Sequence, residues 1–137
     1  MKYAVLLLAV MFAGCDEGSS TEEATSTDGG YETFTIAGET MQVAKEDFPS
    51  IMSWYNAKSA CEELGNGWRL PNKNELKAMY KQLHKQGKGN FEDLWYYWSS
   101  SQGNSGNACY VVFSSGYVYC DGKDDDYGRV RAVRALP

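Results

Sequence analysis

The chain has 137 residues, of which 43% are hydrophobic and 14% aromatic, so it has room for one domain and cannot be a large multidomain enzyme. Its 13 basic and 18 acidic residues give a net charge of −5, which argues against nucleic-acid partners. A single histidine, His84, leaves no imidazole cluster for a metal and no histidine-based catalytic pair. The composition therefore favours a binding module without a cofactor or metal.

The N-terminus carries a short apolar run over residues 4–12, which is too short to span a membrane. The run ends in Ala13-Gly14-Cys15, which resembles the lipobox of a bacterial lipoprotein. We therefore expect a signal peptide over residues 1–14 and lipidation of Cys15, with an ordinary signal peptide as the alternative. The protein would then contact the bacterial outer membrane or cell surface through its lipid anchor. Because acids follow Cys15, retention at the inner membrane is the other location to consider.

Residues 15–30 form a polar segment with five acids, and we expect a disordered tether because so few apolar side chains cannot offset the entropy of ordering. Residues 31–137 form the expected domain. They carry 12 basic and 13 acidic residues, so the domain itself is nearly neutral.

The first half of the domain predicts two strands and two helices. β-type residues on both sides of Gly38 indicate two short strands within residues 31–43. A helix is expected from a Ser53 cap to Gly65, and a second from an Asn72 cap to the region of Gly87, with Glu75 completing a capping box. The apolar stripes that indicate them are Trp54, Ala57, Cys61 and Leu64 in the first helix and Leu76, Met79, Tyr80 and Leu83 in the second.

The second half predicts strands joined by polar turns. An aromatic strand covers Trp95–Ser99, a hairpin turns at Ser114-Ser115-Gly116, and a last strand covers Val130–Val133. Two helices followed by a small antiparallel sheet make an α+β domain.

Several single residues have a structural interpretation. We expect His84 on the surface beside Lys81 and Lys85, and Cys61 buried as a small apolar side chain. Arg69 and Glu75 are expected to form an ion pair or a cap. The expected core residues are Trp68, Leu70, Trp95 and Trp98.

Motifs along most of the domain resemble one bacterial family. They are Trp54-Tyr55-Asn56-Ala57-Lys58, Cys61-Glu62-Glu63-Leu64-Gly65, Gly67-Trp68-Arg69-Leu70-Pro71, Glu75-Leu76, Tyr97-Trp98-Ser99-Ser100-Ser101 and Arg129-Val130-Arg131-Ala132-Val133-Arg134. Together they resemble the Legionella collagen-like-protein C-terminal domain, a relative of the Fibrobacter major paralogous domain. The resemblance implies a C-type-lectin-like fold, which hosts many functions.

Two alternatives to a general ligand-binding module remain open. Formylglycine-generating chemistry on this fold would need a dedicated cysteine constellation, which the chain does not show, so we expect no catalytic residues. Calcium-dependent glycan binding would need oxygen ligands, and Asp121 with the acids at 124–126 could supply some. The sugar-binding signatures of calcium lectins, Glu-Pro-Asn and Trp-Asn-Asp, are absent.

The segment 99–128 has the composition of a binding surface. Ser, Gly, Asp, Tyr and Asn fill 21 of its 30 positions, a set that antibody loops also favour. If Val111, Phe113 and Val118 face the core, the tyrosines of the hairpin face outward together. The alternative is a β-rich segment with ordinary tyrosines. The candidate residues for binding a protein or glycan are Tyr110, Val112, Tyr117, Tyr119, Asp121, Gly122, Asp124, Asp125, Asp126 and Tyr127.

The hairpin also brings two cysteines within reach of each other. A register that pairs residue 111 with 118 also pairs Cys109 with Cys120 on the inward face and allows a disulfide. A left-handed bulge at Gly116 would instead shift the pairing by one residue and separate the two sulfurs.

The same segment has a composition that a diversity-generating retroelement would produce. Replacing the adenines of AAC codons gives fifteen residue types but never Lys, Glu, Gln, Met or Trp. These five types fill 25 of the 72 positions from Tyr31 to Gln102, but only Lys123 among the 35 from Gly103 to Pro137. Strands and glycine-rich turns also disfavour Lys and Glu, so a binding face of fixed sequence is the alternative.

Overall fold

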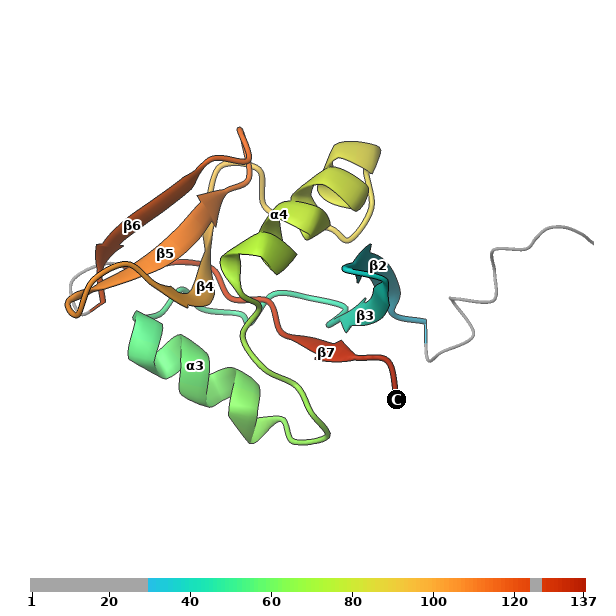
Figure 1. Cartoon of the computed structure of the whole chain (residues 1–137), viewed down its shortest axis with the longest axis horizontal. Coiled ribbons are helices and arrows are strands. Elements are labelled where there is room, and N and C mark those ends of the chain that lie inside the picture. The colour runs from blue at the N-terminus through green and yellow to red at the C-terminus, as the bar shows by residue number, and fades with distance from the viewer. Residues whose placement is uncertain (1–29, 124–126) are drawn as a thin grey trace, which may run out of the picture. The chain divides into compact units, whose positions relative to one another are not determined.

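Two helices and two antiparallel sheets of three strands each make up the part of the chain that the computed structural model describes, residues 30–123 and 127–137 (Figure 1). This confirms the expected α+β class. The elements are β2 (Glu32–Ile36), β3 (Glu39–Val43), α3 (Trp54–Glu63), α4 (Lys73–Gln82), the 3-10 helix η2 (His84–Gln86), β4 (Tyr96–Gln102), β5 (Asn107–Val112), β6 (Val118–Gly122) and β7 (Val133–Ala135).

The strands form two sheets, where one small sheet was expected. Their orders are β2-β3-β7 and β4-β5-β6. The segment between β6 and β7 connects them: Arg129 pairs with β4 in a single parallel bridge, and Val133 then pairs with Arg69 and joins β3. The last strand covers Val133–Ala135, whereas the sequence predicted a strand over residues 130–133. Residues 130 and 132 each accept only one backbone hydrogen bond, from Phe48 and Ala44, and so form no continuous ladder.

Both helices begin at the caps that the sequence predicts. The Ser53 side chain accepts a hydrogen bond from the Asn56 amide at the start of α3. At α4 the Asn72 side chain accepts from the Glu75 amide and the Glu75 carboxylate accepts from the Asn72 amide, so a complete capping box satisfies two helix-end donors. Two guanidinium nitrogens of Arg69 also donate to the Glu75 carboxylate at 2.8 Å each, which confirms the expected ion pair.

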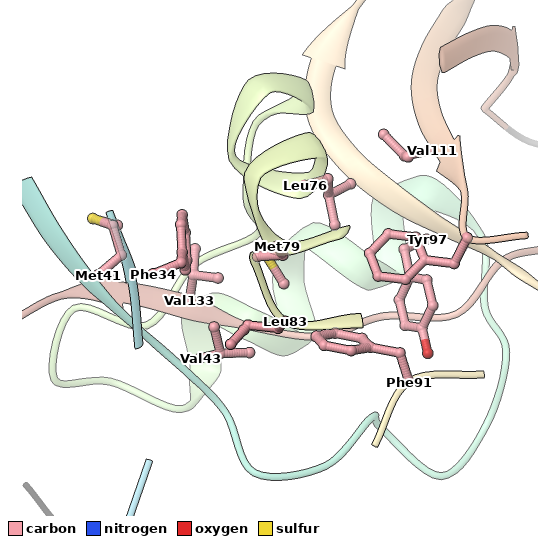
Figure 2. Close-up of a cluster of buried hydrophobic side chains, with 11 residues drawn as sticks. Phe34, Met41, Val43, Leu76, Met79, Leu83, Phe91, Tyr97, Val111 and Val133 are labelled. Atoms are coloured by element: carbon pink, nitrogen blue, oxygen red, sulfur yellow. The ribbon is translucent and has the colours of Figure 1, made fainter. Parts of the chain in front are cut away.

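The first hydrophobic core lies between α4 and the strands of both sheets. Figure 2 shows Leu76 and Met79 pointing from α4 into this core, with Tyr97 and Val111 on one side and Phe34 and Met41 on the other. All of these side chains are 2% exposed or less. Truncating one of them to alanine would cost about 2–5 kcal/mol.

The second core lies on the other face of the β4-β5-β6 sheet, against α3. Successive residues of a strand point to opposite faces, so Tyr97 enters the first core while Trp98 enters the second. The Trp98 indole donates to the Met52 carbonyl at 2.8 Å, and the Trp54 indole donates to the Ser99 carbonyl at 2.7 Å. The sheet is therefore covered on one face by α4 and on the other by α3 (Figure 1).

Arg131 is a buried charge that the sequence analysis did not single out as a core residue. Its side chain is 1% exposed, and its Nε donates to the Asp47 carboxylate at 2.7 Å. The guanidinium also donates to three backbone carbonyls and lies 4.3 Å above the Phe91 ring. The hydroxyl of Tyr97 donates to the other Asp47 oxygen, so this network joins the last segment of the chain to β4.

His84 does not lie on the surface as expected. Its side chain is 17% exposed, its ring contacts Tyr80, Phe91 and Phe113, and its Nε2 lies 2.9 Å from the Asp93 carboxylate. The prediction was wrong because α4 ends at Gln82, so the turn into η2 rotates His84 away from the helix's polar face.

In the described residues no helix is long and apolar enough to cross a membrane.

Candidate ligand-binding surface

The hairpin of β5 and β6 has the register that the cysteine spacing requires. Val111 pairs with Val118 and Cys109 with Cys120, and the two cysteines form a disulfide with an S–S distance of 2.04 Å. Gly116 does adopt a left-handed conformation, with φ 81°, but it does so within the turn and leaves the pairing unshifted. A Cβ at Gly116 would lie 2.6 Å from the Tyr80 ring, so the turn packs closely on α4.

Three tyrosines of this region present more than half of their surface to solvent. Tyr117 is 66% exposed, and Tyr119 and Tyr127 are each 52% exposed. Behind them Val111 and Phe113 are fully buried, and Val118 is half-buried against the first core. Contiguous exposed apolar patches on a monomer mark contact surfaces, whereas single exposed apolar side chains are ordinary. We call Tyr117, Tyr119, Tyr127 and Asp121 the tyrosine surface.

Tyr110 supports this surface more than it adds area to it. Its ring is half-buried and lies 4.1 Å from the Tyr96 ring and 6.0 Å from the Tyr119 ring, measured between centroids. Trp98 contacts it edge-on at 5.8 Å. Tyr110 is half-buried because α3 and the second core cover part of the sheet face that strand alternation assigns to solvent. The three tyrosine rings therefore form a row across β4, β5 and β6 that ends at the exposed Tyr119.

The remaining predicted residues differ in accessibility. Val112 and Gly122 are half-buried, while Asp121 is exposed and its carboxylate accepts a hydrogen bond from the Gly122 amide at 2.9 Å. Asp124, Asp125 and Asp126 lie outside the described residues. Within the described ranges no three His, Cys, Asp or Glu side chains come close enough to share a metal ion.

Lys123 is a buried anchor at the end of β6 that we did not include among the site residues. It is 7% exposed, and its ammonium donates to the Gln102 side chain and, at 3.1 Å, to the Ser105 carbonyl. The ammonium also lies 4.7 Å from the centre of the Trp54 ring. Its isolation as the one lysine among residues 103–137 was the available signal.

Gly128 fixes the chain again five residues later. Its amide and carbonyl both bond to Met52 at 3.1 Å. A Cβ at this position would lie 2.6 Å from the Tyr96 ring, so a side chain is excluded. Tyr127 therefore directly precedes a backbone position that packs against the same row of tyrosines that ends at Tyr119.

Cys61 has the environment of a core residue. It is fully buried on α3, and burial, with a smaller effect from the neighbouring Glu62 carboxylate, raises the pKa of its thiol to about 12. A thiol with such a pKa carries almost no thiolate at neutral pH and is a poor nucleophile.

Of the expected core tryptophans, Trp98 is fully buried, whereas Trp68 and Trp95 are half-buried beneath the guanidinium groups of Arg134 and Arg129.

The fold and surface define a small α+β module, and comparisons with known proteins assign it to a family. Residues 21–134 match the Lcl C-terminal domain, so the chain belongs to that family, as its motifs indicated. The solved structure of the Yersinia pseudotuberculosis adhesin InvE is similar in fold, with a TM-score of 0.52 and 17% identity. That similarity covers 77% of this chain and 34% of the InvE chain, so the chain spans about a third of its length. No curated protein is similar enough to add to the assignment.

Proposed function

We propose that this chain is a lipid-anchored cell-surface protein whose C-type-lectin-like domain binds a protein or glycan through the tyrosine surface. The observation that carries the proposal is the exposure of Tyr117, Tyr119 and Tyr127 above a disulfide-closed hairpin. Tyrosine has few rotatable bonds, so it provides contact area at a small entropic cost, and serine, glycine and asparagine supply adaptable hydrogen bonds nearby. The similar fold of an adhesin supports binding to an external partner.

The proposed chain organisation connects this surface to a membrane. Residues 1–14 would be removed as a signal peptide, Cys15 would carry the lipid, and residues 15–30 would link it to the domain over residues 31–137. The outer membrane or cell surface is the proposed location, since binding to an external partner requires exposure outside the cell. Residues 1–29 lie outside those that the structure describes.

We further propose that the C-terminal segment is hypervariable. The exposed Tyr117, Tyr119 and Asp121 contribute little to either core, whereas Val111 and Phe113 are fully buried, and replacing those would cost roughly 1–4 kcal/mol. Lys123 fits this division, because the one residue of the segment that AAC mutagenesis cannot produce is a buried anchor.

Sequencing this locus in sibling strains tests the hypervariability. We expect substitutions at the exposed and half-buried candidate positions, an unchanged Lys123, and a near-copy of the segment beside a reverse transcriptase gene. Substitutions spread evenly over buried and exposed positions, or no near-copy, would leave an adhesin of fixed specificity as the better account.

A screen of host-cell surfaces and glycan arrays with the mature domain tests the binding function. The Tyr117→Ala, Tyr119→Ala, Tyr127→Ala triple variant should lose binding with an almost unchanged melting temperature. A matched control is Leu64→Ala with Leu136→Ala, which removes two exposed apolar side chains from the end of α3 and the C-terminus. Repeating the screen with a chelator separates a calcium lectin from a metal-independent binder.

A further inference from the structure

The exposed face of α4 carries a regular row of lysines. Lys73, Lys77 and Lys81 follow one another at four-residue intervals on α4, and Lys85 follows beyond its end, in η2. All four side chains are exposed. A rise of about 1.5 Å per residue separates neighbouring lysines on the helix by about 6 Å along its axis. We call these four residues the lysine row.

The lysine row has no counter-charge among the described residues. None of its ammonium groups takes part in an ion pair there. The one acid of α4, Glu75, is buried and bound to Arg69, and Asp93, which follows η2 in the chain, is bound to His84. Lys58 on α3, by contrast, is paired with Glu62 at 3.1 Å. Since the domain is nearly neutral as a whole, this face is a local concentration of positive charge.

An open hollow lies beside the row, between α4 and β2. It is lined by Lys77, Lys81, Asn74, Ala78, Thr35 and Ile36. The side-chain amide of Gln82 bonds to both the amide and the carbonyl of Thr35, at 2.9 and 2.8 Å. The backbone N–H and C=O of Thr35 on the free edge of β2 are therefore already hydrogen-bonded, so a further strand cannot pair there. Two ammonium groups that form no ion pair with the residues described, beside the polar side chains of Thr35 and Asn74, suit an anionic headgroup.

We propose that the lysine row docks on the anionic phospholipid headgroups of the membrane in which the chain is anchored. This inference rests on the proposed lipidation of Cys15, which places a membrane within reach. The 16 residues from Cys15 to Gly30 can span at most roughly 58 Å. The acyl chains on Cys15 would hold the chain at the membrane, and each lysine near an anionic surface adds an attraction of about 1 kcal/mol that would orient the domain.

The position of the row also agrees with the proposed function. α4 covers one face of the β4-β5-β6 sheet (Figure 1), and Val111 lies in the first core on that face. Tyr119 lies beside the ring of Tyr110, which packs against the second core on the opposite face. Docking through α4 therefore holds the domain at the membrane and leaves the side of the sheet that carries Tyr119 open to a partner in solution.

Flotation of the unlipidated chain that begins at Asp16 tests the docking independently of the anchor. The probe is vesicles of phosphatidylglycerol and phosphatidylethanolamine, compared with vesicles of phosphatidylcholine and phosphatidylethanolamine. The Lys77→Gln, Lys81→Gln variant should bind the anionic vesicles about 25-fold more weakly, because each lysine near such a surface contributes about fivefold. The control variant Lys45→Gln, Lys58→Gln changes the net charge equally and should bind like the wild type.

Other outcomes contradict the proposal. The proposal would be overturned if the wild type bound vesicles with and without phosphatidylglycerol equally, or not at all. Equal losses of vesicle binding in the two double variants would also overturn it. Binding to a sulfated polysaccharide but not to the vesicles would assign the row to a different polyanion. Should the first variant fail to fold, Lys73→Gln with Lys85→Gln makes the same test. The proposed role of the tyrosine surface is tested separately, because the Tyr117→Ala, Tyr119→Ala, Tyr127→Ala variant should keep full vesicle binding. The proposed lipidation is tested by mass spectrometry, where an unmodified mass at Cys15 would contradict it.

Discussion

The disulfide between Cys109 and Cys120 should account for a large part of the stability of the hairpin that carries the tyrosine surface. β6 is an edge strand, held by β5 on one side. We predict that replacing both cysteines by alanine lowers the free energy of unfolding and loosens β6, so that ligand binding weakens as well.

The magnitude follows from the length of the loop that the bond closes. The two cysteines are 11 residues apart, and closing a loop of that size removes about 3 kcal/mol of chain entropy from the unfolded state at 25 °C. For the compact unit Glu32–Pro137, this corresponds to a melting temperature lower by roughly 10–15 °C. Cys61 stays in the variant and adds nothing to the difference.

Urea unfolding followed by tryptophan fluorescence measures this effect. Reductant should lower the free energy of unfolding of the wild type to that of the Cys109→Ala, Cys120→Ala variant. It should leave the free energy of unfolding of the variant unchanged. Thiol counting on the denatured, oxidised chain that begins at Asp16 should give one free thiol, that of Cys61. Three free thiols, or stabilities of wild type and variant within about 0.5 kcal/mol, the usual effect of a neutral surface substitution, would refute the reasoning.

Three further predictions concern single residues. Burial raises the pKa of Glu75, but the hydrogen bonds from Arg69 and Asn72 outweigh it and hold the pKa below its ordinary value of 4.5. Glu75→Gln should therefore cost about 2 kcal/mol near neutral pH, and the difference from wild type should shrink as the pH falls through that lowered pKa, which acid-titrated urea melts can follow. The Cys61 thiol should resist a disulfide reagent at pH values well below about 12 in the folded protein and react fully in denaturant. Lys123→Met should cost about 2 kcal/mol in thermal unfolding, because it removes the ammonium's hydrogen bonds and its contact with Trp54.

The local structure could be predicted from the sequence wherever a short-range signal existed. The Ser53 and Asn72 caps, the Arg69–Glu75 pair and the burial of Cys61 all depend on residues a few positions apart. The hairpin register was one of two alternatives, and the decision between them depends on how the Gly116 turn packs against Tyr80, which is remote in the chain.

The features that the sequence did not predict depend on contacts between distant segments. The division into two sheets requires Val133 to meet Arg69 and β3. The buried Arg131 requires Asp47, 84 residues away. Tyr110 is half-buried because α3 covers a face that strand alternation alone assigns to solvent. In each case the contacting segment lies far away in the chain, so no local pattern could identify it.

The most direct test of the central claim is the affinity of the mature domain for a ligand identified by the screen, measured beside the Tyr117→Ala, Tyr119→Ala, Tyr127→Ala variant. If these exposed rings form the binding surface, the variant should bind at least about 100-fold more weakly, since truncating a single hot-spot aromatic side chain costs about 2 kcal/mol or more and 100-fold corresponds to about 2.7 kcal/mol. The Leu64→Ala, Leu136→Ala control should bind like the wild type. Wild-type affinity in the folded tyrosine variant would contradict the claim.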